Sequence, residues 1–437
     1  MTWLVVLLFL SLMLLLLLGY PVAFTLGAVS LIFGVLFLGL DFFSLLPLRI
    51  WGIMNNFTLL AVPLFIFMGI ILDRSGLAED LLETMGRLFG RVGGGLALGI
   101  VIVGAMLAAT TGVVGATVCT MGIIALPTML KHQYSPALAT GTIAASGTLG
   151  QIIPPSIILI LLGDVMGVPV GRLFMGAVIP GSLLVLSFML MIFLFSVFKP
   201  QSAPRLRDKE DSLEVITIFT SLLPPLLLII AVLGSIFFGI ASPTESAAVG
   251  AMGALILAAL HKKLTLANLQ DAMRKTTKLT SMVFLILIGA TAFGLVFRGL
   301  GGDHLVLDAM SALPGGAWGF LLVSMLLIFI LGFFLDFLQI CFIVIPILTP
   351  IANQFGIDLL WFAVLIAINL QTSFLTPPFG FSLFYLKAVT PDRISLKDIY
   401  KGVIPFVIIQ IIVLFVLATF PLLVTWLPDL MDSYHGL

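Results

Sequence analysis

Long apolar runs fill most of this chain, and short polar stretches separate them. A run of roughly 17 to 25 apolar residues can cross the hydrocarbon core of a membrane as one helix. Because such runs follow one another from end to end, the pattern predicts an all-α polytopic membrane protein. The ten predicted spans are 2–18, 21–40, 57–72, 137–163, 176–198, 216–240, 244–260, 279–299, 359–386 and 402–425.

Two of these spans carry a pair of prolines at matching places, Pro154–Pro155 in 137–163 and Pro377–Pro378 in 359–386. Two adjacent prolines remove two backbone donors and clash with the preceding turn, so each helix should break there. Free backbone groups at membrane depth persist only where they are packed in protein or face a polar cavity. The sequence therefore predicts two broken helices with a binding site where they meet.

Two further apolar segments, 96–130 and 317–352, are too long for one crossing and too short for two. As straight helices they would measure about 52 Å, against a hydrocarbon core of about 30 Å. The first is interrupted at 110–115, and the second carries Asp336 at the matching place. Each segment could be a re-entrant hairpin of two half-helices. The charge pattern requires one re-entrant segment in each half and leaves open whether it is this segment or the broken helix.

The chain also repeats itself. Pro154 and Pro377 are 223 positions apart, and Cys119 and Cys341 are 222 apart. If each copy has an odd number of crossings, the second copy enters the membrane from the opposite side, which is the inverted-topology repeat of secondary transporters. The first copy, the linker and the second copy are predicted at 1–200, 201–214 and 215–437.

The basic residues favour this topology. With both hairpins re-entrant and both termini in the periplasm, all but three of the 20 Lys and Arg residues face the cytoplasm, or lie in the cytoplasmic linker. Such a bias is what the positive-inside rule describes. The three exceptions are Arg49, Arg172 and Arg298.

Composition narrows the function. Hydrophobic residues make up 61% of the chain and charged residues 9%, whereas soluble proteins carry about 25% charged residues. Membrane lipid is therefore an expected partner, and nucleic acid is not, because no basic patch occurs. The four histidines fall in predicted loops or the tail and no phosphate-binding loop is present. These observations weigh against a membrane enzyme, and no organic cofactor is expected.

Hydroxyl, amide and backbone oxygens are the main polar groups inside the predicted membrane segments. They suit a hard cation such as Na⁺, and the N-termini of half-helices suit an anionic substrate group. The same hydroxyls could instead bond to neighbouring helices, and Arg298 could extend to the membrane interface. The predicted cation ligands are Thr110, Thr111, Gly112, Gly147, Asp336, Asn369, Thr372 and Thr376. The predicted substrate-binding residues are Arg298, Asp336, Ser146, Thr148 and Ser373.

Asp336 is the one acid predicted at mid-membrane, where an ionisable side chain is a functional-site hypothesis by default. Glu245 has a simpler interpretation. Ser242, Pro243 and Glu245 predict a capping box with proline at the first helical position.

Several long motifs resemble one family. They are ATTGVVGATVCTMG (109–122), ATGTIAASGTLGQIIPPSIILILLGD (139–164), GRLFMGAVIPG (171–181), SPTESAAVGA (242–251), LGFFLDF (331–337), IPILTP (345–350) and LTPPFGFSLF (375–384). Together they resemble the large membrane subunit of tripartite ATP-independent periplasmic (TRAP) transporters. The chain departs from many members at one hairpin tip, where Thr111, Gly112 and Val113 stand in place of a Ser-Gly-Ser type sequence.

The resemblance implies an elevator-type, Na⁺-coupled importer of the ion-transporter superfamily, located in the bacterial inner membrane. It implies two partners, a periplasmic substrate-binding protein and a small four-helix membrane subunit, and a carboxylate substrate. GVVGATV and FRGLGGD are similar to a subgroup associated with 2-oxo, hydroxy and aromatic acids. The alternatives are a stand-alone Na⁺/carboxylate transporter that needs no binding protein and, from another class, a membrane enzyme or channel.

Overall fold

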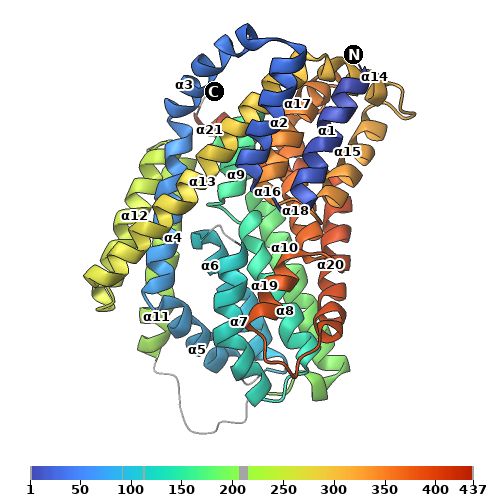
Figure 1. The fold of residues 1–437 in the computed structure, drawn as a ribbon. Coiled ribbons are helices and arrows are strands. Elements are labelled where there is room, and N and C mark those ends of the chain that lie inside the picture. The colour runs from blue at the N-terminus through green and yellow to red at the C-terminus, as the bar shows by residue number, and fades with distance from the viewer. Residues whose placement is uncertain (1, 91, 112–113, 206–214, 436–437) are drawn as a thin grey trace.

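The computed structural model describes residues 2–90, 92–111, 114–205 and 215–435 (Figure 1). All regular elements in these residues are helices, which confirms the all-α prediction. The helices before the linker are α1 (Thr2–Leu17), α2 (Val22–Phe37), α3 (Leu46–Met54), α4 (Ala61–Arg74), α5 (Leu77–Phe89), α6 (Gly95–Thr111), α7 (Val114–Lys131), α8 (Pro136–Thr148), α9 (Ile157–Met166) and α10 (Val170–Phe198), with short turns η1 (Leu40–Leu45), η2 (Thr58–Leu60), η3 (Leu149–Gln151) and η4 (Pro200–Ser202).

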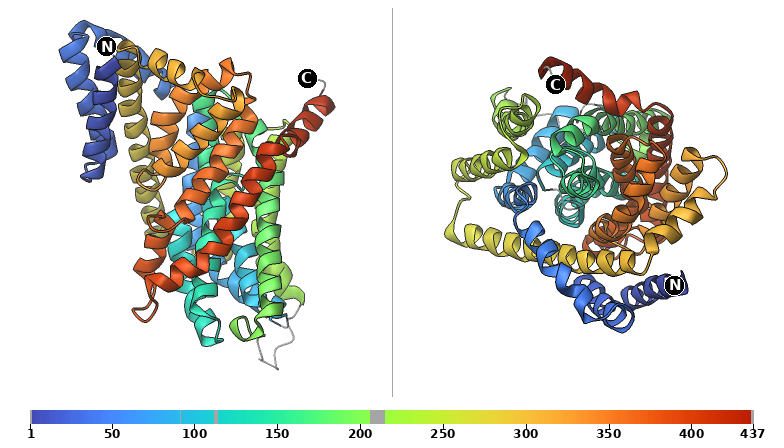
Figure 2. Two further views of the ribbon diagram at one scale, coloured as in Figure 1. Left: turned by 90° about the vertical axis from the view of Figure 1, so that its right-hand side faces the viewer. Right: turned by 90° about the horizontal axis from the view of Figure 1, so that it is seen from above.

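The helices after the linker complete the fold. They are α11 (Val215–Phe237), α12 (Pro243–Leu260), α13 (Leu266–Gly299), α14 (Gly302–Ser311), α15 (Ala317–Leu331), α16 (Phe337–Gln339), α17 (Ile345–Gln354), α18 (Leu359–Leu375), α19 (Phe381–Val389), α20 (Leu396–Thr419) and α21 (Leu422–His435). A π-helical turn, η5 (Ile340–Val344), joins α16 to α17. Both termini lie at the same end of the molecule (Figures 1 and 2).

Fewer helices than expected are long enough to cross a membrane. By length and composition six of the described helices qualify, or seven if the bent pair Leu40–Met54 and Thr58–Arg74 counts as one span. The predicted spans 2–18 and 21–40 form helices of 16 residues each. At 1.5 Å per residue such a helix is about 24 Å long, which is shorter than the hydrocarbon core.

Some helix starts follow directly from local sequence. Ser242 Oγ accepts a hydrogen bond from the Glu245 backbone N–H at 3.3 Å, and Glu245 Oε2 accepts one from the Ser242 N–H at 2.7 Å. This confirms the predicted capping box, with Pro243 as the first residue of α12. Such a box satisfies two backbone donors that the helix itself cannot pair.

One group of helices, here called the frame, comprises α1–α5 and α11–α14. Within it α4 packs on α12 and α13, α13 packs on α2, and α11 packs on α12. The frame helices α4, α11 and α12 lie together along one side of the molecule (Figure 1). The frame is therefore one packed group of helices, and the remaining helices lie against it.

The remaining helices, α6–α10 and α15–α21, are here called the bundle. Its centre is α8, which packs against α6, α7 and α20, and α18, which packs against α15 and α20. A side chain at Gly141 of α8 would meet the backbone of Gly402 of α20, with the Cα only 2.9 Å from the added Cβ. Two glycines thus allow these helices the close approach that is common between membrane helices.

The two spans that carry Pro154–Pro155 and Pro377–Pro378 are interrupted in the structure, whereas α11 continues through its own pair, Pro224–Pro225. The first runs as α8 to Thr148, continues as η3 to Gln151 and resumes as α9 at Ile157. The second ends as α18 at Leu375 and resumes as α19 at Phe381. The Pro154–Pro155 and Pro377–Pro378 peptide bonds are cis.

Candidate functional site

The predicted site residues of the first span lie at the end of α8. Ser146 and Thr148 are fully buried, and Gly147 lies between them. The two arms of the first hairpin segment pack on these residues. A Cβ atom added at Gly104 of α6 would collide with Ser146. A Cβ atom added at Gly147 would collide with Val118 of α7. The end of α8 is therefore enclosed by α6 and α7.

The second span has a similar arrangement. Asn369, Thr372 and Ser373 are buried in the last turns of α18, and Thr376 follows as its C-terminal cap. Asn369 Nδ2 donates a hydrogen bond to the Met325 carbonyl of α15 at 2.7 Å. A Cβ added to Gly332, at the end of α15, would collide with the Ser373 side chain. The end of α18 is thus enclosed by α15.

The two interrupted spans come together. The turn η3 packs on α18, α7 packs on α19, and α17 packs on α9. Two helix C-termini, those of α8 and α18, and two helix N-termini, those of α9 and α19, therefore lie within one packed region. Helix C-termini attract cations, and helix N-termini attract anions.

The hydroxyl groups in this region share one hydrogen-bonding pattern. Each donates its proton to a carbonyl about one turn earlier in its own helix, so the oxygen keeps lone pairs that can accept. The bonds are Ser146 to Thr142 (2.7 Å), Thr148 to Ala145 (2.8 Å), Thr372 to Ile368 (2.8 Å), Ser373 to Leu370 (2.8 Å) and Thr376 to Thr372 (2.7 Å). This pattern is compatible with structural bonding and also with cation coordination by the hydroxyl oxygens.

Two glutamines near the breaks were not among the predicted residues. Gln151 ends η3, and Gln371 precedes Thr372 in α18. Both are fully buried, and neither amide nitrogen nor amide oxygen of either side chain has a hydrogen-bond partner among the described residues. The signal in the sequence was an amide side chain within an apolar span, which is costly and often functional.

Asp336 lies apart from these residues. It caps α16, and its Oδ1 accepts a hydrogen bond from the Phe337 N–H at 2.8 Å. Its side chain lines a hollow of about 450 Å³ together with Lys278 of α13 and Pro21 and Phe24 at the start of α2. Asp336 therefore faces the frame.

Arg298 occupies a different place again. It lies at the end of α13, where it lines a hollow of about 220 Å³ with Arg49, Asp164 and Asp303. No residue of the α8 or α18 ends lines this hollow. The structure thus brings together Ser146, Gly147 and Thr148 with Asn369, Thr372, Ser373 and Thr376, and it separates Arg298 from them.

The remaining predicted ligands belong to the tip of the first hairpin segment. Thr110 and Thr111 end α6, but their side chains are outside the described part of the structure, and Gly112 lies outside the described residues altogether. In the part that is described, no group of three or more His, Cys, Asp or Glu side chains could hold a metal ion.

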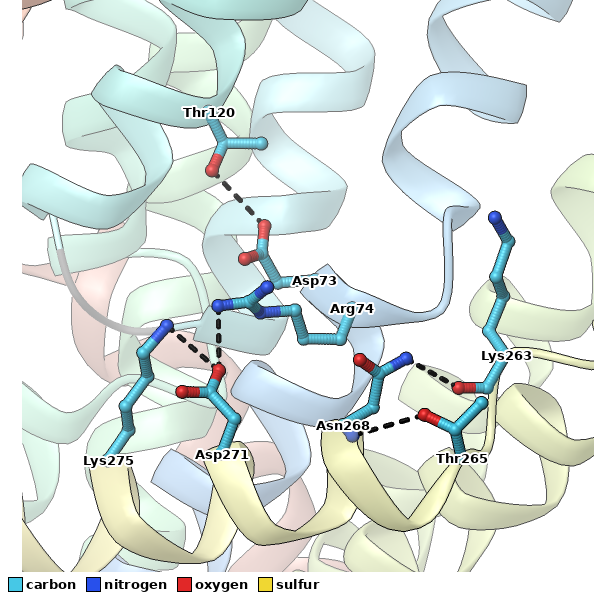
Figure 3. A network of polar contacts seen from close by, with 8 residues as sticks. All are labelled: Asp73, Arg74, Thr120, Lys263, Thr265, Asn268, Asp271 and Lys275. Atoms are coloured by element: carbon cyan, nitrogen blue, oxygen red, sulfur yellow. Dashed lines mark hydrogen bonds and ion pairs between the residues drawn. The ribbon is translucent and has the colours of Figure 1, made fainter.

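Polar contacts also join the frame to the bundle. Thr120 Oγ1 of α7 donates to Asp73 Oδ1 near the end of α4 at 3.2 Å (Figure 3). The neighbouring Arg74 pairs with Asp271 of α13 at 2.7 Å, inside the frame. Before the start of α4, Asn56 donates a hydrogen bond to Asp164 of α9. Both ends of α4 are thus bonded to bundle helices.

Enclosed helix ends with buried polar groups, within a set of membrane-length helices, are typical of membrane transporters. The chain belongs to the TRAP transporter family. Residues 9–423 match the family described as "Tripartite ATP-independent periplasmic transporter, DctM component". This match confirms the family predicted from the sequence motifs and the prediction that the chain is not an enzyme.

Relatives with assigned names agree with this family assignment. The chain is 31% identical over 420 residues to the sialic acid TRAP transporter large permease protein SiaM of Vibrio cholerae, covering 95% of this chain and 96% of that protein. It is 31% identical over 386 residues to the C4-dicarboxylate TRAP transporter large permease protein DctM of Pseudomonas aeruginosa, covering 88% and 89%. Its fold resembles the crystal structure of the Alcanivorax borkumensis YdaH transporter, with a TM-score of 0.66, 15% identity and coverage of 96% and 98%.

Proposed function

We propose that this TRAP large permease couples the inward movement of Na⁺ to the import of an organic acid. One observation carries the proposal: the two interrupted spans bring two helix C-termini and two helix N-termini into one enclosed region. A cation at the C-termini and a carboxylate at the N-termini would each be stabilised by the helix dipole and by each other's charge. Such coupling makes the binding of one favour the binding of the other.

The cation ligands in this proposal are oxygen atoms at the helix ends. They come from Gly147 in the first span, from Asn369, Thr372 and Thr376 in the second, and from Thr110, Thr111 and Gly112 at the hairpin tip. Ser146, Thr148 and Ser373 would contact the substrate. Asp336 contributes negative charge beside the region, and Arg298 attracts the carboxylate from the hollow at the end of α13.

The movement proposed is that of an elevator, in which the bundle slides along the frame. The bundle contains both interrupted spans, so the bound ion and substrate would travel with it. The inverted repeat, with copies at 1–200 and 215–437, would provide the second arrangement of the same contacts. Such a slide requires the Thr120–Asp73 and Asn56–Asp164 bonds to break.

The substrate proposed is a carboxylate, and 2-oxo, hydroxy and aromatic acids are the first to test. Support comes from the family, whose named relatives carry sialic acid and C4-dicarboxylates, and from the sequence features of GVVGATV and FRGLGGD. A periplasmic binding protein would deliver it, and a small four-helix membrane subunit would complete the transporter. Both termini would face the periplasm.

Transport by reconstituted protein tests this function. The large subunit, its small subunit and its binding protein are placed in proteoliposomes with an inward Na⁺ gradient. Radiolabelled 2-oxo, hydroxy, aromatic and C4 acids and sialic acid are offered one at a time. We expect uptake of at least one acid that requires both Na⁺ and the binding protein. Na⁺-driven uptake by the large subunit alone would instead identify the stand-alone carrier.

A further inference from the structure

Three buried glutamines have unpaired amide groups in the bundle. Gln151, Gln371 and Gln410 are each fully buried. Both the oxygen and the nitrogen of each side-chain amide lack a hydrogen-bond partner among the described residues. Buried polar groups are almost always paired in native proteins, so three unpaired amides in one bundle need an explanation.

The contacts between the helices place the three glutamines at neighbouring heights in the bundle. Gln410 belongs to the buried face of α20, together with Gly402 and Leu417. Gly402 lies against Gly141 of α8, and the Leu417 carbonyl accepts a hydrogen bond from Trp361 Nε1 of α18 at 2.7 Å. Gln410 therefore lies on the face of α20 that packs against α8 and α18, at a height between these two contacts.

Helix geometry fixes the height more closely. Both α8 and α20 run toward the end of the molecule that carries the termini, and α18 runs the other way (Figures 1 and 2). From Gly402 to Gln410 the axial rise is about 12 Å, and the same rise from Gly141 reaches the start of η3, which Gln151 ends. The axial distance from Leu417 back to Gln410 on α20 is about 10 Å. The same distance along α18 from Trp361 ends within one turn of Gln371.

The chemistry of the amides indicates the ligand. An amide offers both a donor and an acceptor, whereas a bare cation would satisfy only the oxygens and a carboxylate only the nitrogens. None of the three side chains lines the hollows described above, and all are fully enclosed, so the ligand is small. Water both donates and accepts, and buried waters typically bridge otherwise unpaired polar groups.

We propose that Gln151, Gln371 and Gln410 form one internal site for ordered water. Through this water the first helix break is joined to α18 and α20, and the two interrupted spans move as one body. The site has a structural and positioning role that stands apart from the ion and substrate ligands proposed above. Its test does not depend on which acid the protein carries.

Thermal unfolding of the purified full chain with its small subunit tests the proposal. Met replaces each glutamine, since it has a similar length and no strong polar group. Each single variant should lose about 1 to 3 °C in Tm, because the water and the two remaining amides lose a partner. The triple variant should lose clearly less than the three single losses added together, because no unpaired amide remains. Gln354→Met, at an exposed position in α17, is the matched control and should leave Tm unchanged.

Four results would overturn the proposal. Additive losses in the triple variant would mean that the glutamines act separately, and unchanged single variants would mean that they need no partner. A rise in Tm with Na⁺ over choline that the three Gln→Met variants abolish would assign the site to a cation. High-resolution density of the wild-type complex is the independent measurement, with water expected about 2.7 to 3.2 Å from at least two of the three amides. Direct bonds between the amides, with no water, would also overturn it.

Discussion

Thr120 donates a hydrogen bond to Asp73 across 3.2 Å and so bonds the second arm of the first hairpin segment to the end of α4. The two residues belong to the bundle and the frame, which are proposed to slide past each other. Beside this bond lies a polar hollow of about 310 Å³ lined by residues of both parts, among them Ile123 of the bundle and Lys263 of the frame. The bond therefore favours the arrangement seen in this structure.

The first prediction is that Thr120→Val shifts the protein away from this arrangement. A hydrogen bond from a neutral donor to a charged carboxylate contributes about 1.5 to 3 kcal/mol net, or roughly a 10- to 150-fold change in population. Oxidative cross-linking between cysteines at Ile123 and Lys263, with Cys119 and Cys341 replaced, measures that population and should fall in yield.

Thr128→Val is the matched control for this experiment. Thr128 lies on the same helix, but its hydroxyl donates to its own helix, to the Ile124 carbonyl at 3.3 Å. Its substitution should leave the cross-linking yield unchanged. An equal yield in Thr120→Val and wild type would show that the bond does not hold the bundle in place.

The second prediction concerns Asp336. If its carboxylate balances part of the charge of a bound cation, Asp336→Asn removes an interaction of about 1.5 to 3 kcal/mol. The Na⁺ concentration for half-maximal uptake should then rise roughly 10- to 150-fold, while the protein still inserts and folds. Asp308→Asn, at an exposed position in α14, is the control. Unchanged Na⁺ dependence would leave Asp336 as the counter-charge of Lys278, with which it shares a hollow.

The third prediction separates hydroxyls at the helix ends from hydroxyls elsewhere. Thr148→Val and Ser373→Ala should each raise the half-saturating Na⁺ concentration, by less than Asp336→Asn, because each removes a hydroxyl that contacts the substrate, and substrate binding favours Na⁺ binding only indirectly. Ser324→Ala is the control, since Ser324 is also buried and bonded to its own helix, at Leu321 O (3.2 Å) and Phe320 O. Equal effects at all three positions would indicate packing loss alone.

Local features of the fold were predictable, and contacts between distant segments were not. The Ser242–Glu245 cap depends on four neighbouring residues. A proline pair predicts missing backbone donors but does not by itself predict a break, since Pro224–Pro225 lies inside the continuous helix α11. The helix ends were less predictable: α8 ends at Thr148, six residues before Pro154, because η3 intervenes. A sequence does not state which buried amide lacks a partner, so Gln151 and Gln371 could not be separated from other polar residues.

Ion pairs show the same limit. Arg172, Arg49 and Arg298 share the property of lying outside the predicted cytoplasmic clusters. In the structure Arg172 pairs with Asp429 at 3.1 Å and with Asp432 at 3.2 Å, both in α21, and Arg49 and Arg298 line one hollow. These roles depend on how α10, α13 and α21 are arranged in space, and single-sequence patterns do not contain that arrangement.

The fourth prediction is topological. Lys131→Cys, at the end of α7, should react with membrane-impermeant maleimide only from the cytoplasmic side, and His304→Cys, in α14, only from the periplasmic side. Both residues are exposed. Lys131 belongs to the first predicted repeat and His304 to the second. Labelling both from the same side would contradict the inverted arrangement.

The last prediction is that the contact between Gly332 and Ser373 positions the second hairpin segment for transport. A Cβ at Gly332 would lie 2.8 Å from the Ser373 Cβ and still closer to its hydroxyl, so Gly332→Ala must push the end of α15 away from α18. Gly332 has ordinary right-handed helical backbone angles, so alanine adds crowding without backbone strain. We expect at least a 10-fold loss of Na⁺-dependent uptake with normal insertion, whereas Gly27→Ala, which meets no atom within 4 Å, should transport normally. Since Ser373→Ala removes the hydroxyl that the new methyl group meets, the double variant should recover part of the lost activity. A double variant no better than Gly332→Ala alone would mean that the loss arises elsewhere, which would contradict a specific role for this contact.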